Sequence, residues 1–320
     1  MSIITVLNEC VANKETRFSY EMLPPLKGAG IQATYDAIDN LMPYNPAFIS
    51  VTFHRYITKE VIDNNGVRHY HALRRRPGTV GIASAIRQRY GLEVLPHLIC
   101  SGHSRYDIED ALIDMDFLGL ENVLALRGDK EQGTDHFEPH PQGYSYGIDL
   151  VRQIREMNNG IFVDGQVEDC YHSRFTIGVA GYPEKHLDAS SLDADIKALK
   201  AKVDAGADFV ITQLFFDNEI FFDFVRRCRA ADIDVPIIPG IKPFSTIKHA
   251  TLLPDTFGVK LPEIFINEIL KHADNADAIR QIGKEWCLSQ CRELKAAGFP
   301  IIHLYTMGKT NDIADMVRQI

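Results

Sequence analysis

Short apolar runs recur along the whole chain, with room for a helix between most of them. Each run is nearly continuous and is bounded by glycine, proline or charged residues. Runs of this kind are typical of parallel strands that are buried on both faces. The predicted strands span residues 18–23, 48–53, 93–100, 122–128, 175–182, 209–216, 235–241 and 301–307.

Amphipathic segments fill the intervals. Ser104 is followed three residues later by Asp107, which is the signature of a helix N-terminus, and Gly119 marks the end of that helix. Its apolar stripe comprises Ile108, Leu112 and Met115. Further helices are predicted from Ser190–Ser191 to Gly206, after Asn218, after Ser245 and after Thr310.

About eight strand–helix units in 320 residues favour a TIM-type (β/α)8 barrel that forms a single domain over residues 1–320. A doubly wound parallel sheet is the alternative. The absence of a GxGxxG sequence after the first strand argues against a dinucleotide-binding sheet of that kind.

Two extra hairpin-like insertions interrupt the pattern. Residues 60–71 contain Asn-Asn-Gly between strand-like arms, and residues 160–169 have a similar form around Asp164-Gly165. The first insertion follows strand two on the side where barrel active sites lie, so it could overhang the site. The second precedes strand five on the opposite side, where a role in stability or oligomer formation is expected. Both could also be plain surface excursions.

Composition narrows the class of protein. Hydrophobic residues make up 45% and charged residues 24%, as in soluble globular proteins. No apolar run approaches the roughly 18 residues of a membrane helix, and the N-terminus lacks the features of a signal peptide. The six cysteines are scattered without a CxxC pair, so we expect a reducing cytoplasm and no metal site.

The net charge of −9 and the pI of about 5.7 argue against nucleic acid or an anionic membrane as a partner. One basic run, Arg74-Arg75-Arg76, precedes a Pro-Gly turn. A solvated or subunit-facing loop is a better interpretation of this run than a phosphate site.

Polar or titratable residues lie in or just after nearly every predicted strand. Because active sites of TIM barrels form at the carboxyl ends of the strands, these residues are expected to converge on one rim. Glu21, His97 and Gln213 are the most informative, since they lie inside apolar runs. The full set is Glu21, Thr52, His54, His97, Arg127, Asp129, Tyr182, Glu184, His186, Gln213, Asp217, Lys242, His303 and Tyr305.

Glu21 is a carboxylate within an apolar strand. Desolvation disfavours its charged form, so we expect a raised pKa and a side chain that can act as a general acid. Asp129 follows Leu126-Arg127-Gly128 in a loop and is expected to be ionised, although it could instead cap a helix or pair with Arg127. Glycoside hydrolysis also uses two carboxylates, but the single tryptophan, Trp286, lies in a helical region and offers no sugar platform.

At these residues the sequence resembles the methylenetetrahydrofolate reductase family, flavoenzymes of one-carbon metabolism. The opening signature reads Tyr-Glu-Met-Leu-Pro-Pro from Tyr20, where the family has a sequence similar to Phe-Glu-Phe-Phe-Pro-Pro. FISVTF, PHLIC, ALRGD, AGYPEKH, DADIKALKAKVDAGAD, ITQLFFD, IPGIKP and HLYT follow in family order. The resemblance covers the chain from about Phe18 to Tyr305.

The resemblance implies a barrel that holds FAD at the strand ends. NADH or NADPH would reduce the flavin and leave, and methylenetetrahydrofolate would then bind and be reduced to methyltetrahydrofolate. The family's acid corresponds to Glu21, its electrostatic aspartate to Asp129, and a glutamine that contacts flavin and folate to Gln213. The implied flavin-binding residues are Thr52, His97, Leu126, Arg127, Gly128, Asp129, Tyr146, Tyr182, His186, Ala189, Asp195, Lys202, Gln213 and Tyr305.

Asp195 and Lys202 can also be assessed from their spacing. They are seven residues apart and share a helix face, where they could hold a ribose and a diphosphate or simply be solvated. The chain departs from the family pattern at three positions. Ala201 occupies the place of a frequent arginine, Ile247 that of an aromatic residue in some relatives, and Lys242 that of a commonly apolar residue.

Two other functions compete with the reductase. A barrel lyase or aldolase would use Lys242 as a Schiff-base amine. A non-catalytic subunit would bind flavin or folate without turnover, although retention of Glu21, Asp129 and Gln213 argues against it. A homo-oligomer is expected from the resemblance, and the sequence does not distinguish NADH from NADPH.

Overall fold

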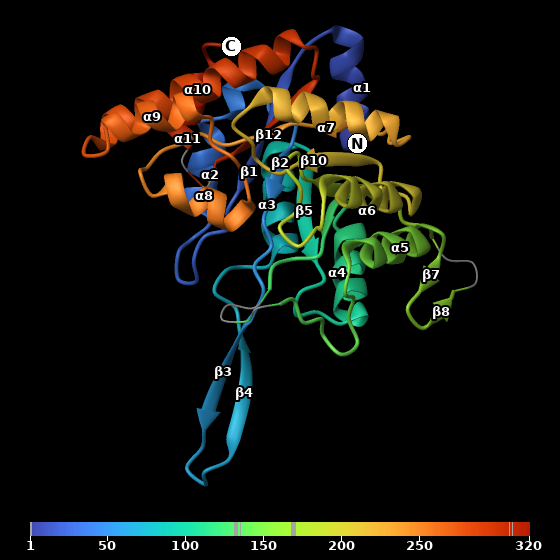
Figure 1. Ribbon diagram of the computed structural model, residues 1–320. Coiled ribbons are helices and arrows are strands. Elements are labelled where there is room, and N and C mark those ends of the chain that lie inside the picture. The colour runs from blue at the N-terminus through green and yellow to red at the C-terminus, as the bar shows by residue number, and fades with distance from the viewer. Residues whose placement is uncertain (1, 131–133, 135, 168–170, 307, 309) are drawn as a thin grey trace.

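The computed structural model describes residues 2–130, 134, 136–167, 171–306, 308 and 310–320. A parallel sheet lies at its centre, and helices surround the sheet (Figure 1). The sheet strands are β1 (Arg17–Met22), β2 (Ile49–Val51), β5 (Val94–Ile99), β6 (Asn122–Leu126), β9 (Thr176–Gly181), β10 (Phe209–Thr212), β11 (Ile237–Ile238), β12 (Gly240–Ile241) and β13 (Ile301–Tyr305).

The order of the strands shows that the sheet closes on itself. It runs β11-β10-β9-β6-β5-β2-β1-β13-β12, with parallel pairing throughout. The two strands at the ends of this order, β11 and β12, are separated only by Pro239. Proline cannot donate to a ladder, so this residue divides one strand into two. The seventh strand therefore joins β10 to β13, and the sheet forms the predicted TIM-type barrel rather than an open doubly wound sheet.

Helices form at the positions that the amphipathic pattern predicts. Ser104 and Asp107 form a complete capping box at the start of α4, and Ser191 caps α6. The segment after Ser245 becomes helical only at His249. The helices are α1 (Ile3–Asn13), α2 (Gln32–Asp39), α3 (Thr79–Tyr90), α4 (Arg105–Phe117), α5 (Gly147–Asn158), α6 (Leu192–Asp204), α7 (Asn218–Ala230), α8 (His249–Phe257), α9 (Glu263–Lys271), α10 (Ala276–Ala296) and α11 (Thr310–Val317), with a 3-10 turn at Met42–Tyr44.

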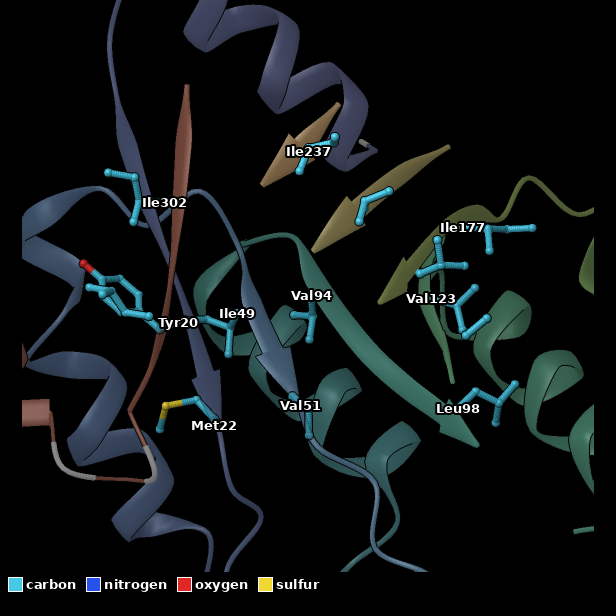
Figure 2. Close-up of a cluster of buried hydrophobic side chains, with 14 of the residues drawn as sticks. Tyr20, Met22, Ile49, Val51, Val94, Leu98, Val123, Ile177, Ile237 and Ile302 are labelled. Carbon is cyan, nitrogen blue, oxygen red and sulfur yellow. The ribbon is translucent and has the colours of Figure 1, made fainter. Parts of the chain in front are cut away.

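Alternation along the strands divides the core into two layers. Tyr20, Ile49 and Val94 belong to a cluster that also contains the buried residues of the surrounding helices (Figure 2). Leu95 and Leu124 belong to a second cluster with residues of α1. Neighbouring residues of one strand thus enter different clusters, because successive side chains point to opposite faces. The second cluster fills the inside of the barrel.

Helix α1 closes the end of the barrel at which the strands begin. Its apolar side buries Ile3, Val6 and Leu7 against the interior cluster. The backbone amide of Ile3 donates to the Asn122 side-chain oxygen at 2.8 Å. The Asn122 amide donates to Glu93 at 2.9 Å, and this buried carboxylate also receives a bond from Arg87. A chain of polar contacts thereby fixes α1 to the barrel.

Both hairpin insertions are present. Strands β3 (Ile57–Ile62) and β4 (Arg68–Leu73) pair antiparallel and extend away from the barrel as an arm, so they do not fold over the strand ends (Figure 1). Strands β7 (Ile161–Phe162) and β8 (Gly165–Gln166) form a much shorter hairpin after α5. Residues 168 and 169 of the second predicted hairpin, Met307 of the eighth predicted strand and Cys170 lie outside the described residues.

Substitution of Asn122 should weaken the attachment of α1. Asn122→Ala removes, in a buried site, the bond that the Ile3 amide donates and the bond that Asn122 donates to Glu93, and losing each costs about 1–3 kcal/mol. We expect the free energy of unfolding, measured by urea denaturation, to fall by about 2–4 kcal/mol. Asn159→Ala, at an exposed asparagine at the end of α5, is the control. Equal stability of the two variants would contradict this role of Asn122.

Candidate functional site

Strand alternation places a second set of side chains inside the barrel near the carboxyl ends of the strands. Since Tyr20 and Met22 face the helices, Glu21 faces the interior. The same alternation directs Ser50, His97 and His303 inward from β2, β5 and β13. In the sheet Glu21 lies beside Ser50 on one side and Tyr305 on the other. The structure thus brings together residues that are far apart in the sequence.

Glu21 is 9% exposed. Burial raises its pKa to about 7, and the positive charge of Lys242 opposes this shift. The predicted raised pKa is therefore supported, and the carboxyl group is poised between its protonated and ionised forms near neutral pH. Lys242, one of the departures from the family pattern, acts on the proposed acid directly.

His97 approaches Glu21 with 3.9 Å between Nε2 and Oε2. Burial, with a contribution from His54, lowers the pKa of His97 to about 3, so its ring is neutral near pH 7. This contact is therefore not an ion pair, although two titratable groups meet. The same His97 nitrogen lies 2.6 Å from the Ser50 hydroxyl, which satisfies the buried ring.

His303 on β13 repeats this arrangement with Ser19 on β1, the strand that carries Glu21. Its Nδ1 lies 2.9 Å from the Ser19 hydroxyl, and its ring stacks on Phe48 with centroids 5.9 Å apart. Burial, together with His97, lowers its pKa to about 3. Ser19 and Ser50 lie inside apolar runs, and a small polar residue in such a run is the local signal for a buried partner of this kind.

The side chain of Tyr305 reaches past Gly240 of the seventh strand to β10. Its hydroxyl donates to the Thr212 carbonyl at 2.7 Å, and burial raises its pKa. The approach requires Gly240, because a Cβ there would lie 2.2 Å from the Thr212 carbonyl oxygen and 2.8 Å from the Tyr305 ring. The glycine in IPGIKP is therefore required because Thr212 and Tyr305 leave no room for a side chain there.

The loop after β6 turns sharply at Gly128, whose φ is +83°. A Cβ at this position would also lie 2.9 Å from the Cβ of Ser101. Ser101 donates through its hydroxyl to the Asp129 carbonyl at 2.9 Å. The Asp129 side chain is exposed, and its charge acts on the pKa values of both His54 and Tyr182. Asp129 is therefore fixed through its backbone, and its exposed carboxylate lies near enough to His54 and Tyr182 to act on their pKa values.

Arg127 does not pair with Asp129. Its guanidinium donates to the Asp188 carboxylate at 2.6 Å, and this contact joins the loops after β6 and β9. The same guanidinium lies over the Phe137 ring. The backbone amide of Asp188 in turn donates to His186 Nδ1 at 3.1 Å. The alternative of an Arg127–Asp129 pair is therefore not observed.

The loop after β9 holds two further predicted residues. The rings of Tyr182 and His186 meet edge to face with centroids 4.7 Å apart. Burial raises the pKa of Tyr182 and lowers that of His186. The amide of His186 donates to Asp195 at 2.8 Å, and the Lys185 ammonium donates to the Ala189 carbonyl at 2.9 Å. These bonds order the loop against the start of α6.

Asp195 and Lys202 share a face of α6 as predicted, but each also has a protein partner. The Lys202 ammonium donates to the Ala180 carbonyl at 2.8 Å. Burial lowers its pKa to about 8, and Asp195 opposes that shift. Ala201, beside them, is exposed. The helix therefore delivers one buried amine to the edge of the site.

Gln213 completes the rim from β10. Its side-chain oxygen accepts from the Leu214 amide at 2.9 Å. Within the described part of the chain its NH2 group donates to no other residue, so two donors are available to a ligand.

Thr52 lies 3.2 Å from His54 through Oγ1 and Nε2, and Tyr146 is 64% exposed at the start of α5. Leu126 ends β6 and is partly buried.

Glu184 is a second, partly buried carboxyl group on this rim. Burial raises its pKa to about 7, and the amide of Lys260 donates to one of its oxygens at 2.8 Å. Its other oxygen has no hydrogen-bond partner. Trp286 donates to the Phe216 carbonyl and packs on Phe265, so it belongs to the core. Ile247 also packs against the hydrophobic cluster that contains Phe216 and Phe265.

Comparison with known proteins identifies the family. The family model described as methylenetetrahydrofolate reductase matches residues 6–320. The chain belongs to the methylenetetrahydrofolate reductase family. It is 32% identical over 306 residues to the 5,10-methylenetetrahydrofolate reductase of Salmonella typhimurium, covering 95% of this chain and 90% of that protein.

Eukaryotic relatives are longer. Methylenetetrahydrofolate reductase 1 of Schizosaccharomyces pombe is 33% identical over 308 residues, which cover 96% of this chain and 46% of that protein. The chain thus spans about half the length of such relatives. An uncharacterized protein from Clostridium thermocellum that binds two copies of 5-methyl-5,6,7,8-tetrahydrofolic acid has a TM-score of 0.56 at 11% identity, with 98% of this chain and 100% of that chain covered, and supports the fold.

Two further findings concern membrane-spanning helices and metal sites. No helix in the described ranges has the length and apolar character needed to cross a membrane. Among the residues with described positions, no cluster of three or more histidine, cysteine, aspartate or glutamate side chains could hold a metal ion. Cys10, Cys100, Cys228, Cys287 and Cys291 are free and buried.

The raised pKa of Glu21 predicts a pH-dependent contribution to stability. Between pH 4.5 and about 7 the folded chain holds a proton that the unfolded chain releases, so stability falls as pH rises through this window. A shift of this size corresponds to about 3 kcal/mol. Glu21→Gln cannot lose this proton, so the stability of the variant relative to the native chain should increase by about 2.5 kcal/mol between pH 5 and pH 8.

The measurement is the free energy of unfolding by urea at both pH values. Glu156→Gln removes an exposed carboxylate from α5 and is the matched control for loss of one charge. A difference between Glu21→Gln and the native chain that is the same at both pH values would refute the assignment of the raised pKa.

Proposed function

We propose that this protein reduces methylenetetrahydrofolate to methyltetrahydrofolate with FAD as cofactor and NADH or NADPH as electron donor. Family membership supports the reaction. The observation that carries the assignment of the site is Glu21, a carboxyl group buried in the barrel mouth with a pKa raised by burial to about 7. Residues 1–320 would act as one FAD-binding catalytic domain.

The residues at the strand ends fit a flavin. The turn at Gly128 has no room for a side chain, Gln213 has free donors, and Tyr146 is exposed at the rim. The buried Lys202 amine and Arg127 supply positive charge suitable for a diphosphate. We assign FAD to Thr52, His97, Leu126, Arg127, Gly128, Asp129, Tyr146, Tyr182, His186, Ala189, Asp195, Lys202, Gln213 and Tyr305.

Bound FAD would supply a ring system that accepts and donates hydride, and the protein supplies position and electrostatics. Glu21 in its protonated form donates to a nitrogen of the imidazolidine ring of the folate. The carbon–nitrogen bond can then break and leave an iminium cation. The neutral His97 and His303 leave this acid without a cationic histidine partner, which would otherwise favour its ionised form.

Asp129 and Gln213 complete the site. The exposed Asp129 carboxylate at the mouth stabilises the developing positive charge on the folate. Gln213 uses its side-chain NH2 group to orient flavin and folate. NAD(P)H and the folate would occupy the same mouth in turn, in a ping-pong sequence. We further propose a cytoplasmic homo-oligomer, with no nucleic acid or membrane partner.

Two other functions make different predictions. A lyase that uses Lys242 would be trapped covalently by borohydride with a carbonyl substrate. Lys242 lies close enough to Glu21 to lower its pKa, so it would be in the site in either case. A non-catalytic subunit would bind flavin or folate without turnover. An anaerobic visible spectrum that bleaches with NADH and returns with methylenetetrahydrofolate would favour the reductase over both.

Glu21→Gln should separate the two half-reactions. Only ring opening of the folate needs the acid, so the variant should bind FAD and be reduced by NAD(P)H at a rate near that of the native enzyme. Reoxidation by methylenetetrahydrofolate should slow by about 10²–10⁴-fold. Stopped-flow absorbance measures both steps. Loss of both half-reactions with FAD retained would contradict the role of Glu21.

Asp129→Asn should affect the folate step through charge. Without the carboxylate, the iminium cation loses electrostatic stabilisation, and we expect that half-reaction to slow by about 10–100-fold. The midpoint potential of the bound FAD should also change, because a negative charge is removed near it. Glu138→Gln, at an exposed position in the same connection, is the control. An unchanged folate step and an unchanged potential in Asp129→Asn would exclude the proposed role.

A further inference from the structure

The β3–β4 arm is a ribbon of two antiparallel strands that points away from the barrel (Figure 1). An isolated two-stranded ribbon is marginally stable in water, because it has no core of its own. The outer edges of the ribbon pair with no other strand in the described part of the chain. Large apolar side chains are nevertheless exposed along it and on its turn, namely Val61, Ile62, Val67, Tyr70 and Leu73. The arm therefore has the character of a surface that a partner covers.

The arm also carries positive charge that is not neutralised. Arg68 pairs with Glu60 at 3.2 Å. Among the residues with described positions, no carboxylate pairs with Lys59 or Arg75, and both side chains are exposed. A surface that fits the arm should therefore combine apolar side chains with carboxylates.

Helix α4 presents such a combination to solvent. Tyr106, Ile113 and Phe117 are exposed and are spaced so that they form one stripe along the helix. Phe117 is 87% exposed. Asp110 lies in the stripe and Asp114 beside it; both are exposed, and neither pairs with a cation in the described ranges. We call these five residues the α4 face. Its apolar and acidic character complements that of the arm.

We propose that the arm of one copy of this chain docks on the α4 face of a second copy, and that two copies exchange arms about a two-fold axis. In this dimer Lys59 and Arg75 lie against Asp110 and Asp114, and the apolar side chains of the arm cover Phe117. The proposal gives the surfaces of the homo-oligomer proposed above. It does not depend on the proposed reaction.

The dimensions of the two surfaces agree. A strand of six residues and a helix of thirteen residues are each about 20 Å long. One such contact is small for a stable interface, which buries at least about 1,000 Å². Reciprocal exchange forms the contact twice within one closed pair. This favours a symmetric dimer over a single docked arm.

The charges disfavour the other pairings of these surfaces. Two arms placed together would bring Lys59 and Arg75 of both copies near one another, and two α4 faces would do the same with their carboxylates. The arm also points away from α4 of its own chain (Figure 1). The complementary surface for each arm is therefore on another copy.

The test is a charge exchange, measured by analytical ultracentrifugation of the full chain. The arm variant carries Lys59→Glu and Arg75→Glu, and the helix variant carries Asp110→Lys and Asp114→Lys. Each variant alone has like charges at both contacts, so its dimer Kd should rise at least about 100-fold above the native value. In an equimolar mixture one contact is native and the other has both signs reversed. The mixture should therefore dimerise with a Kd within about 3-fold of the native value.

Two controls make the same changes of net charge at exposed positions elsewhere. They are Lys197→Glu with Lys271→Glu, and Asp255→Lys with Asp274→Lys. Both should associate as the native chain does. All variants should retain the native circular dichroism spectrum, since the substituted side chains are exposed.

The apolar part of the contact has a separate test. Phe117→Ser removes the most exposed apolar side chain of the α4 face and should raise the dimer Kd at least about 10-fold. Ile264→Ser, at an isoleucine of α9 that is 76% exposed, is the control and should leave the Kd unchanged. This pair keeps the proposal testable if a charge variant fails to fold.

Four results would overturn the proposal. A native chain that sediments as a monomer up to about 100 μM has no such dimer. Dissociation of the arm variant alone would indicate arm-to-arm pairing, and dissociation of the helix variant alone would indicate pairing of two α4 faces. A mixture that stays monomeric would show that the two surfaces do not meet. None of these measurements uses FAD or folate, so they remain decisive if the proposed function fails.

Discussion

Closure of the parallel strands into a barrel is the constraint on which the rest of the structure depends. Every strand is buried on two faces, so alternate residues must satisfy two different interiors. At one end the interior is filled by apolar side chains and by helix α1, which Asn122 holds in place. At the other end it is filled by polar groups that have hydrogen-bond partners. The barrel is therefore closed by apolar side chains at one end and carries the candidate site at the other.

At the polar end of the barrel, the two buried histidines are uncharged. His97 and His303 are neutral because burial lowers their pKa values to about 3, and Ser50 and Ser19 satisfy them. A cationic imidazole beside Glu21 would stabilise its carboxylate and remove the acid near neutral pH. Among the residues with described positions, Lys242 is the positive charge that acts on the pKa of Glu21. The proposed chemistry thus uses the low polarity of the barrel interior rather than an ion pair.

The two hairpin insertions lie at opposite ends of the barrel. The short β7–β8 hairpin lies before β9, at the end of the barrel away from the reacting groups. The long β3–β4 arm leaves the end that carries the site, and its base is bonded to the loop after β1. An addition at this end can change which substrates bind without altering the barrel.

The sequence by itself determined the barrel, because apolar runs of strand length and the helices between them are local patterns. It also identified Glu21 as exceptional, since a carboxylate in such a run must be desolvated. It could not show that Ser50 satisfies His97, that Arg127 pairs with Asp188, or that the arm points away from the mouth. Those features depend on contacts between residues that are distant in the chain, and on the register with which neighbouring strands pair. Only the closed barrel fixes both.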